Sequence, residues 1–489
     1  MNRFVQYIII ICLSVSLINC KKDKLLTDSS ATIAFSQDSI LFDTVFTTIG
    51  STTRQLKVYN HNHQKINLSS VRLEQGQSSN FIISVDGSSG KQASDVEILA
   101  QDSIYIFIQV NVNPTSQNSP LIIQDRILFD VNGNQQFVAL EAWGQDAYYH
   151  YPDKAIQFKN GFLPYSTVST QTNVVVHWPK DKPHVIYGWL VVDSTQTLKI
   201  DAGVNVYFHQ NAGLWIYRYG TLQVDGTFGN EVTFKGDRRE ADYADLPGQW
   251  DRIWINEGSI NNYINYAIIK NSYIGLQTEP LITAVPPSKL KLTNTIIQNC
   301  SKYGIYSVAY NIWGANNIIS NCKDYCAAFV LGGNYTFLHT TFANYFNKDG
   351  GRAGTSCVYI NNYFDDNGVT KIAPLDSCFF GNSIIDGSIA NELSLDVKPD
   401  NTLPPNVKFV NNLLKTSAFT GTLIVNSGNN FGGNPDFKDA VNYDFGINGG
   451  SAAKGLGDAN LRNLFLSYLF TDIKGKSRAS STDAGAVNN

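Results

Sequence analysis

The sequence is poor in charge, in methionine and in paired cysteines. Charged residues make up 16% of the 489 positions, one residue is Met, and the formal net charge is -4 with a pI near 6.0. This balance excludes a nucleic-acid-binding surface, which needs a basic footprint. The seven Cys contain no CxxC pair, because three residues separate the nearest two, Cys322 and Cys326. The spacing therefore gives no zinc site.

The N-terminal apolar run is too short to cross a membrane. It spans residues 4 to 18, FVQYIIIICLSVSLI, and follows Arg3, whereas a spanning helix needs about 20 residues. This length is typical of a secretory signal peptide. The tetrapeptide LINC, which ends at Cys20, resembles the bacterial lipobox. That resemblance implies a signal peptide over residues 1 to 19, cleavage before Cys20, and acylation of its thiol and new amino end.

Acylation at Cys20 would tether the chain to a membrane, because each buried CH2 contributes about 0.8 kcal/mol. The following Lys21, Lys22 and Asp23 resemble the export tag of Bacteroidota surface lipoproteins. Residues 20 to 31 are then a tether, and we expect an outer-membrane lipoprotein at the cell surface or on the periplasmic face. The alternatives are a solvated charged segment and an exported protein in which Cys20 is incidental.

The segment from residue 32 to residue 145 predicts a β-sandwich. Short runs with period-two alternation, such as TTRQLKVYN and SIYIFIQVNV, are separated by Asn, Gly and Ser clusters. The successive stretches ILFDTV, LKVYN, SSNFIIS, QDSIYIFIQVNVNP and VNGNQQFVALEAWG resemble the immunoglobulin-like modules of the Hydin and SPD-2 type. The resemblance implies a spacer or binding unit without catalytic residues.

The rest of the chain lacks any apolar run of helical length and is repetitive. After a linker and N-terminal cap over residues 146 to 186, strand-length runs are punctuated by Gly from residue 187 onward. An apolar residue followed two positions later by Asn recurs at intervals of 18 to 30 residues, at Asn271, Asn299, Asn321, Asn344, Asn362, Asn382 and Asn412. A short-stranded period in the twenties predicts a solenoid.

The strongest internal match fixes the register of two coils. TIIQNCSKYGIY aligns with NIISNCKDYCAA at an offset of 22, which places Cys300 on Cys322 and Tyr303 on Tyr325. Such partners should stack about 4.8 Å apart, as in neighbouring strands of one sheet. The recurring Asn residues should form one internal ladder that satisfies turn backbone groups, with apolar stacks filling the core.

Two blocks in this region resemble a known family. They are GTLQVDGTFGNEVTFKGDRREADYADLPGQWDRIWI, and the closing pair NPDFKDAVNYDFGINGGSAAKGLG and TDIKGKSRASSTDAGAVNN. Both resemble the right-handed parallel β-helix proteins of Bacteroidota lipoproteins. The fold expected is all-β: an immunoglobulin-like β-sandwich followed by a right-handed parallel β-helix over residues 187 to 489, with a C-terminal cap.

Parallel β-helices often act on polysaccharides, so we looked for a catalytic set. A hydrolase needs carboxylates on both sides of the scissile bond, and Asp365 and Asp366 are the adjacent Asp pair of the β-helix. The Gly-His-Gly and Arg-Ile-Lys motifs of polygalacturonases are missing. The alternative for this pair is two exposed turn aspartates.

A lyase needs a base and a group, often calcium, that neutralises the substrate carboxylate. The candidates lie in GDRREADYADLPGQW: the carboxylates Asp237, Glu240, Asp242 and Asp245 as calcium ligands, beside Arg238 and Arg239 as bases. Acidic and basic residues this close together in the sequence are also typical of a surface loop whose charges neutralise one another.

Aromatic residues offer a second kind of site. The candidate ligand-binding residues are Trp215, Tyr217, Tyr219, Trp250 and Trp254. In LWIYRYG, an inward Leu214 would place Trp215 and Tyr217 outward, where flat rings with a polar edge suit sugars or protein partners. The alternative is packing against the neighbouring loop or domain.

These observations favour a monomeric lipoprotein that binds an extended partner without catalysis. The partner expected is a polysaccharide or a surface protein, with no cofactor. The alternatives are a polysaccharide lyase or glycoside hydrolase, with calcium in the first case, and a structural stalk.

Overall fold

The computed structural model describes residues 24–46, 53–112, 121–158, 161–281, 288–348, 350–400, 402, 404–419, 424–464, 469–478 and 482–489. The signal peptide and Cys20 predicted from the sequence lie outside these residues. The chain divides into two compact units, Met1–Ala147 and Tyr148–Asn489. Within the described residues, no helix combines the length and hydropathy needed to cross a bilayer.

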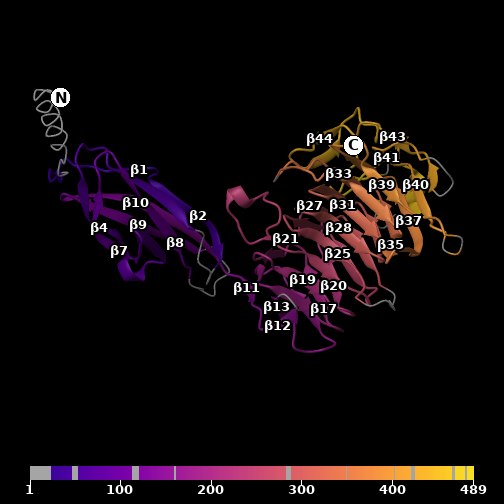
Figure 1. The fold of residues 1–489 in the computed structure, drawn as a ribbon, viewed down its shortest axis with the longest axis horizontal. Coiled ribbons are helices and arrows are strands. Elements are labelled where there is room, and N and C mark those ends of the chain that lie inside the picture. The colour runs from indigo at the N-terminus through magenta and orange to yellow at the C-terminus, as the bar shows by residue number, and fades with distance from the viewer. Residues whose placement is uncertain are drawn as a thin grey trace, which may run out of the picture. The chain divides into compact units, whose positions relative to one another are not determined.

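The first unit is a sandwich of two sheets (Figure 1). One sheet has the order β1 (Ala34–Phe35), β3 (Arg54–Tyr59), β8 (Ser103–Val110), β5 (Phe81–Val85), β6 (Ser88–Gly90). The other has the order β2 (Ser39–Phe46), β10 (Asn134–Gln145), β9 (Leu121–Val131), β4 (Ile66–Leu73), β7 (Gln92–Ile98), and a short 3-10 turn, η1 (Gly76–Ser78), follows β4. Strands β1-β3-β8-β5 and β4-β9-β10 match the ABED and CFG sheets of the immunoglobulin fold.

Period-two alternation builds the core of the sandwich. In β10, Val138, Leu140 and Ala142 are at most 1% exposed, whereas Phe137 and Trp143 of the same strand face solvent. Strands of this kind bury one face and leave the other accessible. The predicted β-sandwich is therefore confirmed.

The second unit is a parallel β-helix, as predicted (Figure 1). Its β11 sheet consists of β11 (Tyr148–His150), β15 (His184–Ile186), β18 (Asn205–Phe208), β21 (Val232–Gly236), β24 (Ala267–Lys270), β27 (Ile296–Cys300), β30 (Ile318–Cys322), β33 (Thr341–Asn344), β38 (Ile384–Gly387), β41 (Leu413–Leu414) and β43 (Asn430–Phe431). Its β12 sheet consists of β12 (Lys154–Phe158), β13 (Gly161–Thr167), β16 (Trp189–Val192), β19 (Gly213–Ile216), β22 (Ile253–Ile255), β25 (Ile274–Thr278), β28 (Tyr303–Val308), β31 (Tyr325–Val330), β34 (Val358–Asn361) and β39 (Leu393–Asp396). Its β14 sheet consists of β14 (Val175–Trp178), β17 (Thr197–Asp201), β20 (Thr221–Asp225), β23 (Asn262–Asn265), β26 (Leu290–Thr293), β29 (Asn311–Ala315), β32 (Gly333–Leu338), β37 (Leu375–Gly381), β40 (Val407–Val410) and β42 (Ile424–Ser427).

Each coil adds one strand to each of the three sheets, so like residues stack along the axis. One inward column runs through the β12 sheet and is at most 5% exposed throughout: Leu190, Leu214, Ile253, Leu276, Ile305, Ala327, Val358 and Leu393. Cys300 pairs with Cys322 and Tyr303 with Tyr325, as the internal alignment predicted. Residues 146 to 186, expected as linker and cap, already contribute strands to all three sheets.

The Asn ladder expected from the sequence is confirmed along the β11 sheet, where Asn299 donates to Asn271 at 2.8 Å, but it does not include every recurring Asn, because these belong to different corners of the coil. Asn271 follows β24, and Asn299 and Asn321 are the next-to-last residues of β27 and β30, all in the β11 sheet, with φ of 64°, 58° and 51°. Asn382 and Asn412 instead follow strands of the β14 sheet. More than one corner of each coil contains a residue in the left-handed conformation, which Asn tolerates. The apolar-x-Asn pattern therefore occurs at several corners, and its intervals do not equal the length of one coil.

The C-terminal segment, expected as a cap, covers the outer face of the β11 sheet. Phe445, Ile473 and Ala486 pack there with Ile318 and Ala343. The remaining elements are the hairpins β35 (Tyr363–Asp366) with β36 (Val369–Ile372) and β44 (Phe437–Asp439) with β45 (Asp444–Ile447), the turn η2 (Ala241–Tyr243), and α2 (Ala459–Leu464).

Candidate functional site

The outward face of the β12 sheet carries a row of partly exposed tyrosines. In β28, alternation places Ile305 inside the coil and Tyr306 outside, and Tyr359 lies in the same register two strands further on. Tyr303 and Tyr325 pair with each other at the starts of β28 and β31. We refer to Tyr303, Tyr306, Tyr325 and Tyr359 as the tyrosine row.

The rings of the tyrosine row follow three successive coils. The centroids of Tyr303 and Tyr325 are 5.8 Å apart, and those of Tyr325 and Tyr359 are 5.5 Å apart. Tyr306 stacks beside Tyr303 at 5.2 Å with an interplanar angle of 18°. These separations fall in the range of favourable aromatic pairs. The row is therefore a continuous aromatic strip along the helix axis.

Two further tyrosines and two lysines lie at the ends of the tyrosine row. Tyr273 is 40% exposed, and the Lys302 ammonium lies 5.6 Å from its ring and 5.2 Å from that of Tyr303. A hydrogen bond with Tyr273 raises the pKa of Lys302. At the other end, the Lys398 ammonium lies 3.7 Å from the ring of Tyr363. Such cation–π contacts contribute about 0.5–1 kcal/mol at exposed sites and restrict the rings.

The phenol groups act as neutral hydrogen-bonding groups. Burial, with a hydrogen bond to Asp396, raises the pKa of Tyr359 to about 12, and burial also raises the pKa of the other three phenols of the row. The Tyr359 and Tyr363 hydroxyls donate to one oxygen of Asp396, at 3.1 and 2.8 Å. Flat apolar faces edged by hydroxyls and a carboxylate suit the alternating CH and OH groups of sugar rings.

The predicted tryptophan platform does face outward but is covered. Trp215 stacks on Trp254 at 4.6 Å and 11°, and its indole N–H donates to Asn256 at 2.6 Å. Residues from β12 and β13, including Leu163, pack over this cluster, and Trp215 is 7% exposed. Trp215 is therefore closed to a ligand, whereas Trp254 is partly exposed.

The other three predicted aromatic residues lie in different surroundings. Trp250 belongs to the main core of the β-helix, 1% exposed and stacked on Phe208 at 4.1 Å. Its placement in a binding platform is therefore incorrect, because its side chain points into the coil. Tyr217 packs edge-on against Trp215 at 5.4 Å. Tyr219 is 45% exposed with a φ of 63°.

The carboxylate-rich loop neutralises its own charges. Asp237 bonds to His209 at 2.7 Å. Arg238 pairs with Glu240 at 3.2 Å. Arg239 lies 5.4 Å from the Tyr207 ring and Asp245 lies 3.7 Å from Lys270, while Asp242 is in the η2 turn. No group of three His, Cys, Asp or Glu with metal-binding geometry occurs among the described residues.

Asp365 and Asp366 lie on the exposed β35–β36 hairpin. Asp365 accepts a hydrogen bond from the Thr370 hydroxyl at 3.2 Å, and Asp366 accepts one from Asn367 at 3.0 Å. Their partners are the opposite strand and the turn of the same hairpin, as in the turn alternative.

A polar groove on the β14 sheet was not predicted. It has a volume of about 450 Å³ and is lined by Asp225, Tyr263, Asn265, Tyr266, Lys291, Thr293, Asn294, Phe470 and Thr471. The Tyr263 hydroxyl donates to Asp225 at 2.5 Å, and Lys199 lies 3.4 Å from the same carboxylate. Asp201 is the in-register neighbour of Asp225. The groove thus brings together the acidic and basic groups that no sequence motif contains, because they come from different coils.

The tyrosine row was also absent from the predicted ligand residues. Its first step was visible in the sequence, since Tyr303 aligned with Tyr325. Tyr359 was not, because the loop between β33 and β34 lengthens this coil to 31 residues, from Ala328 to its register partner Tyr359. A search for Tyr residues that recur once per coil, with the coil length allowed to vary, would have found Tyr359.

No protein-family model matches the chain, and no curated protein matches it. Among solved structures, the catalytic unit of thermostable GH87 alpha-1,3-glucanase from Streptomyces thermodiastaticus strain HF3-3 is similar at 11% identity and a TM-score of 0.21, covering 77% of this chain and 88% of that one. The human CEP192 ASH / PapD-like domain (PapD-like domain 7) is similar at 11% identity and a TM-score of 0.17, covering 25% and 89%. A family 123 glycoside hydrolase from Clostridium perfringens is similar at 10% identity and a TM-score of 0.17, covering 23% and 26%. The fold assignment rests on the strand pairing.

Proposed function

We propose that this protein is an exported lipoprotein whose β-helix binds an extended glycan chain along the tyrosine row. The observation that supports this most is the placement of Tyr303, Tyr325 and Tyr359 on successive coils with centroids 5.8 and 5.5 Å apart. A polymer of repeated sugar units can engage such repeated rings together, which gains affinity by multivalency. A surface protein with an extended segment is the other partner class that this strip fits.

The anchor in this proposal is Cys20, acylated after removal of residues 1 to 19. Support comes from the LINC sequence and from the charged residues after it, which resemble those of Bacteroidota surface lipoproteins. The sandwich would then act as a Hydin/SPD-2-like spacer between an outer membrane and the β-helix, in a monomer. Replacing Cys20→Ala should move the protein from the membrane fraction to the soluble fraction. Retention of this variant in washed membranes would contradict the anchor.

The glycan proposal is tested by electrophoresis of the soluble chain beginning at Lys21 in native gels that contain single polysaccharides. We expect one polymer class, neutral or acidic, to retard the chain in proportion to its concentration. The matched control is Tyr105→Ala on the sandwich, which removes an exposed ring outside the β-helix and should leave the retardation unchanged. A chain that migrates freely in every polymer would contradict glycan binding and favour the protein partner.

A polysaccharide hydrolase or lyase is the second candidate, and the groove at Asp225 is the observation that favours it. Asp225, Tyr263 and Lys291 line one groove, and a carboxylate, a phenol and an ammonium group can supply acid and base. Both reaction types create new reducing ends, so one assay of the same polymers covers both, with calcium present for a lyase. Reducing ends from the wild type but not from Asp225→Asn would establish this alternative. No release by the wild type leaves binding alone.

A further inference from the structure

The chain is fastened to one end of the sandwich from Leu25 onward. Leu25 forms a parallel bridge with Lys65, and the Leu26 backbone N–H donates to the Lys65 carbonyl group at 2.8 Å. The Asn132 side chain donates to the carbonyl groups of Leu26 at 2.8 Å and Asp28 at 3.0 Å. Leu26 also packs against the sandwich core. From Leu25 on, the segment that the sequence predicted as a tether is therefore held against the sandwich.

Strand direction shows which end of the sandwich this is. β4 begins one residue after Lys65, and β10 begins two residues after Asn132. β10 then runs to Gln145, so the chain continues into the second unit from the opposite end of the sandwich. We refer to the end that holds Leu25 as the Leu25 end.

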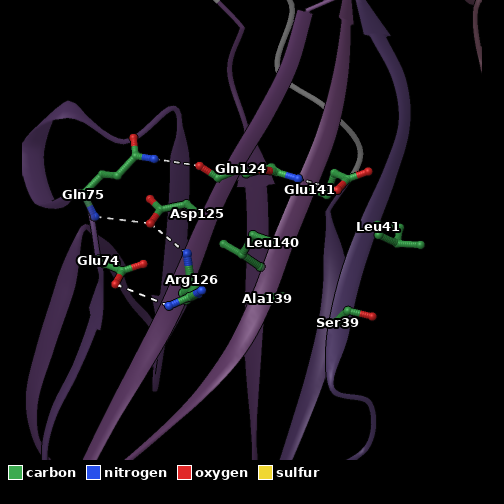
Figure 2. A pocket seen from close by; sticks show the side chains of 10 residues that line it. All are labelled: Ser39, Leu41, Glu74, Gln75, Gln124, Asp125, Arg126, Ala139, Leu140 and Glu141. Atoms are coloured by element: carbon green, nitrogen blue, oxygen red, sulfur yellow. Dashed lines mark hydrogen bonds and ion pairs between the residues drawn. The ribbon is translucent and has the colours of Figure 1, made fainter.

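The opposite end carries a polar groove beside the far end of β4 (Figure 2). Its volume is about 440 Å³. Arg126 lies 3.7 Å from Glu74. The Gln75 side-chain amide donates to the Gln124 carbonyl group at 2.6 Å. Charged and amide groups here pair with one another, as Figure 2 shows, so this part of the sandwich is suited to water.

Two leucines are exposed at the Leu25 end. Leu25 is 41% exposed, and Leu99, in the loop between β7 and β8, is 50% exposed. Ile66 pairs with Ile98 in antiparallel strands. The adjoining residues Lys65 and Leu99 are therefore neighbours, and Lys65 is also the partner of Leu25. The two leucines thus lie on one small surface, with Lys65 between them.

The charges at the Leu25 end nearly cancel. Lys65 pairs with Glu97 at 2.9 Å. Lys24, Asp28 and Asp102 are exposed and carry charges of both signs. Attraction to a charged partner is therefore weak here, and contact depends on the two leucines, which gain free energy when they leave water for an apolar boundary.

The proposed anchor lies close to this surface along the chain. Five chain steps separate Cys20 from Leu25, and five residues of fully extended chain cover at most about 18 Å. A short tether gives its two ends an effective concentration on the order of millimolar. A contact too weak to hold a free protein on a bilayer is therefore populated once Cys20 is in the membrane.

We propose that the Leu25 end of the sandwich docks on the lipid bilayer, with Leu25 and Leu99 at the boundary between headgroups and acyl chains. The inference rests on the proposed anchor at Cys20, which brings this end to the membrane. The leucines then determine which part of the sandwich faces the lipid. Because the charges nearly cancel, docking does not require anionic lipid.

The test uses the mature chain beginning at Cys20, coupled through this thiol to a maleimide lipid in phosphatidylcholine vesicles. The other five cysteines of that chain are buried, so coupling is confined to Cys20. The coupled lipid imitates the anchor, and docking is therefore measured whether or not cells acylate Cys20. Failure of the anchor itself is detected separately, by the membrane retention of Cys20→Ala.

Docking is measured as quenching of tryptophan fluorescence by phosphatidylcholine with brominated acyl chains. We expect the emission added by Leu99→Trp to be quenched at least fivefold more strongly than that added by Gln77→Trp, an exposed position in η1 at the opposite end. Equal quenching at the two positions, or none at either, would overturn the docking. Wild-type quenching as strong as that of the Leu99→Trp emission would place the exposed Trp143 and the face of β10 on the bilayer, which would overturn contact through the Leu25 end.

Leu25→Gln, made in the Leu99→Trp chain, is the decisive variant. It should reduce the quenching at least threefold, because it removes one of the two apolar contacts. Leu41→Gln, which removes another exposed leucine of the sandwich, is the matched control and should leave the quenching unchanged. Thermal unfolding curves show whether each variant keeps the fold. Quenching that survives Leu25→Gln undiminished would overturn the role of the leucines, since the tether alone would then explain the contact.

Discussion

At the scale of single residues, exposure separates the aromatic side chains that can meet a ligand from those that cannot. Trp215 and the Tyr303 ring both face outward from the β12 sheet, but Trp215 is 7% exposed beneath the β12–β13 hairpin, whereas Tyr303 is partly exposed. Alternation along a strand gives the direction of a side chain. It does not reveal a hairpin that covers the side chain, and for this reason the sequence did not show that Trp215 is buried.

Two histidines that contact each other in the first coil, the buried His184 and the partly buried His150, make stability depend on pH. His150 and His184 share a hydrogen bond of 3.0 Å, and His184 stacks on Trp178 at 3.7 Å. Burial lowers the pKa of His150 to about 4 and that of His184 to about 3, to which the charge of His150 adds while Asp181 opposes. Between these values and the unfolded value of about 6.5, the unfolded chain binds more protons. Stability is therefore complete above about pH 6.5 and is lost as the pH falls toward 4 and 3.

We predict that the free energy of unfolding decreases by on the order of 5 kcal/mol between pH 6.5 and pH 4 as a result of this pair, about half of it from each histidine. Denaturant titrations at several pH values, followed by tryptophan fluorescence, measure it. His150→Gln removes one titrating group, so the slope against pH should fall by up to about 1.4 kcal/mol per pH unit. An identical slope in this variant would contradict the assignment.

At the scale of the element, the corners between strands depend on Asn more than the strands do. Asn321 has a φ of 51°, is 5% exposed, and accepts the Tyr345 backbone N–H at 2.9 Å. Asn299 donates to Asn271 on the preceding coil at 2.8 Å. Side-chain amides thus connect the backbone of one coil to that of the next.

Replacing Asn321→Leu should reduce the free energy of unfolding by about 2–4 kcal/mol. The loss combines an unsatisfied buried N–H group with left-handed backbone that Leu tolerates poorly. Asn261→Leu, at an exposed position of the same unit, should change it by less than about 0.5 kcal/mol. Equal melting temperatures for both variants would contradict the role of the corner.

The C-terminal TDIKGKSR motif is explained by one buried carboxylate. Asp472 is fully buried and accepts the backbone N–H groups of Lys474 at 2.9 Å, Lys476 at 2.7 Å and Asn488 at 2.8 Å. The motif therefore fastens the chain end rather than forming a chemical site.

Asp472→Ala should destabilise the β-helix by about 2–4 kcal/mol, since three backbone donors lose a charged acceptor. Because this segment packs over the outer face of the β11 sheet, protease should cleave the variant first near the C-terminus. Limited proteolysis with mass spectrometry measures this. Cleavage that begins in the sandwich would contradict the assignment.

The sequence predicted these elements unevenly, for a physical reason. Strand alternation was enough to predict the sandwich. The 22-residue repeat was enough to predict the parallel β-helix and the pairing of Cys300 with Cys322, because stacked coils repeat side-chain environments. The prediction of one Asn ladder was only partly correct, because Asn residues also occupy corners outside the β11 sheet. The prediction that Trp250 faces outward was wrong because Trp250 lies outside the strands, in an isolated bridge. Alternation along a strand therefore does not give the direction of its side chain. The groove at Asp225 and the tyrosine row each combine residues from neighbouring coils. Because coil length varies, the sequence alone does not show which residues become neighbours.

At the scale of the whole molecule, the two units suit different partners. The β-helix repeats one outward position on every coil, so its surface matches a ligand that is itself a repeating polymer. The sandwich has no such repeat, because its strands belong to two sheets of five strands each.

The central claim is that the tyrosine row binds a glycan, and one comparison tests it most directly. It is the affinity of the double variant Tyr303→Ala/Tyr325→Ala for the polysaccharide that retards the wild type, beside Tyr303→Phe/Tyr325→Phe and with all melting temperatures measured. We predict at least a tenfold loss of affinity for the Ala pair, because each lost stacking contact costs about 1 kcal/mol, and near-wild-type affinity for the Phe pair, which keeps both rings. A folded Ala variant that binds as tightly as the wild type would contradict the claim.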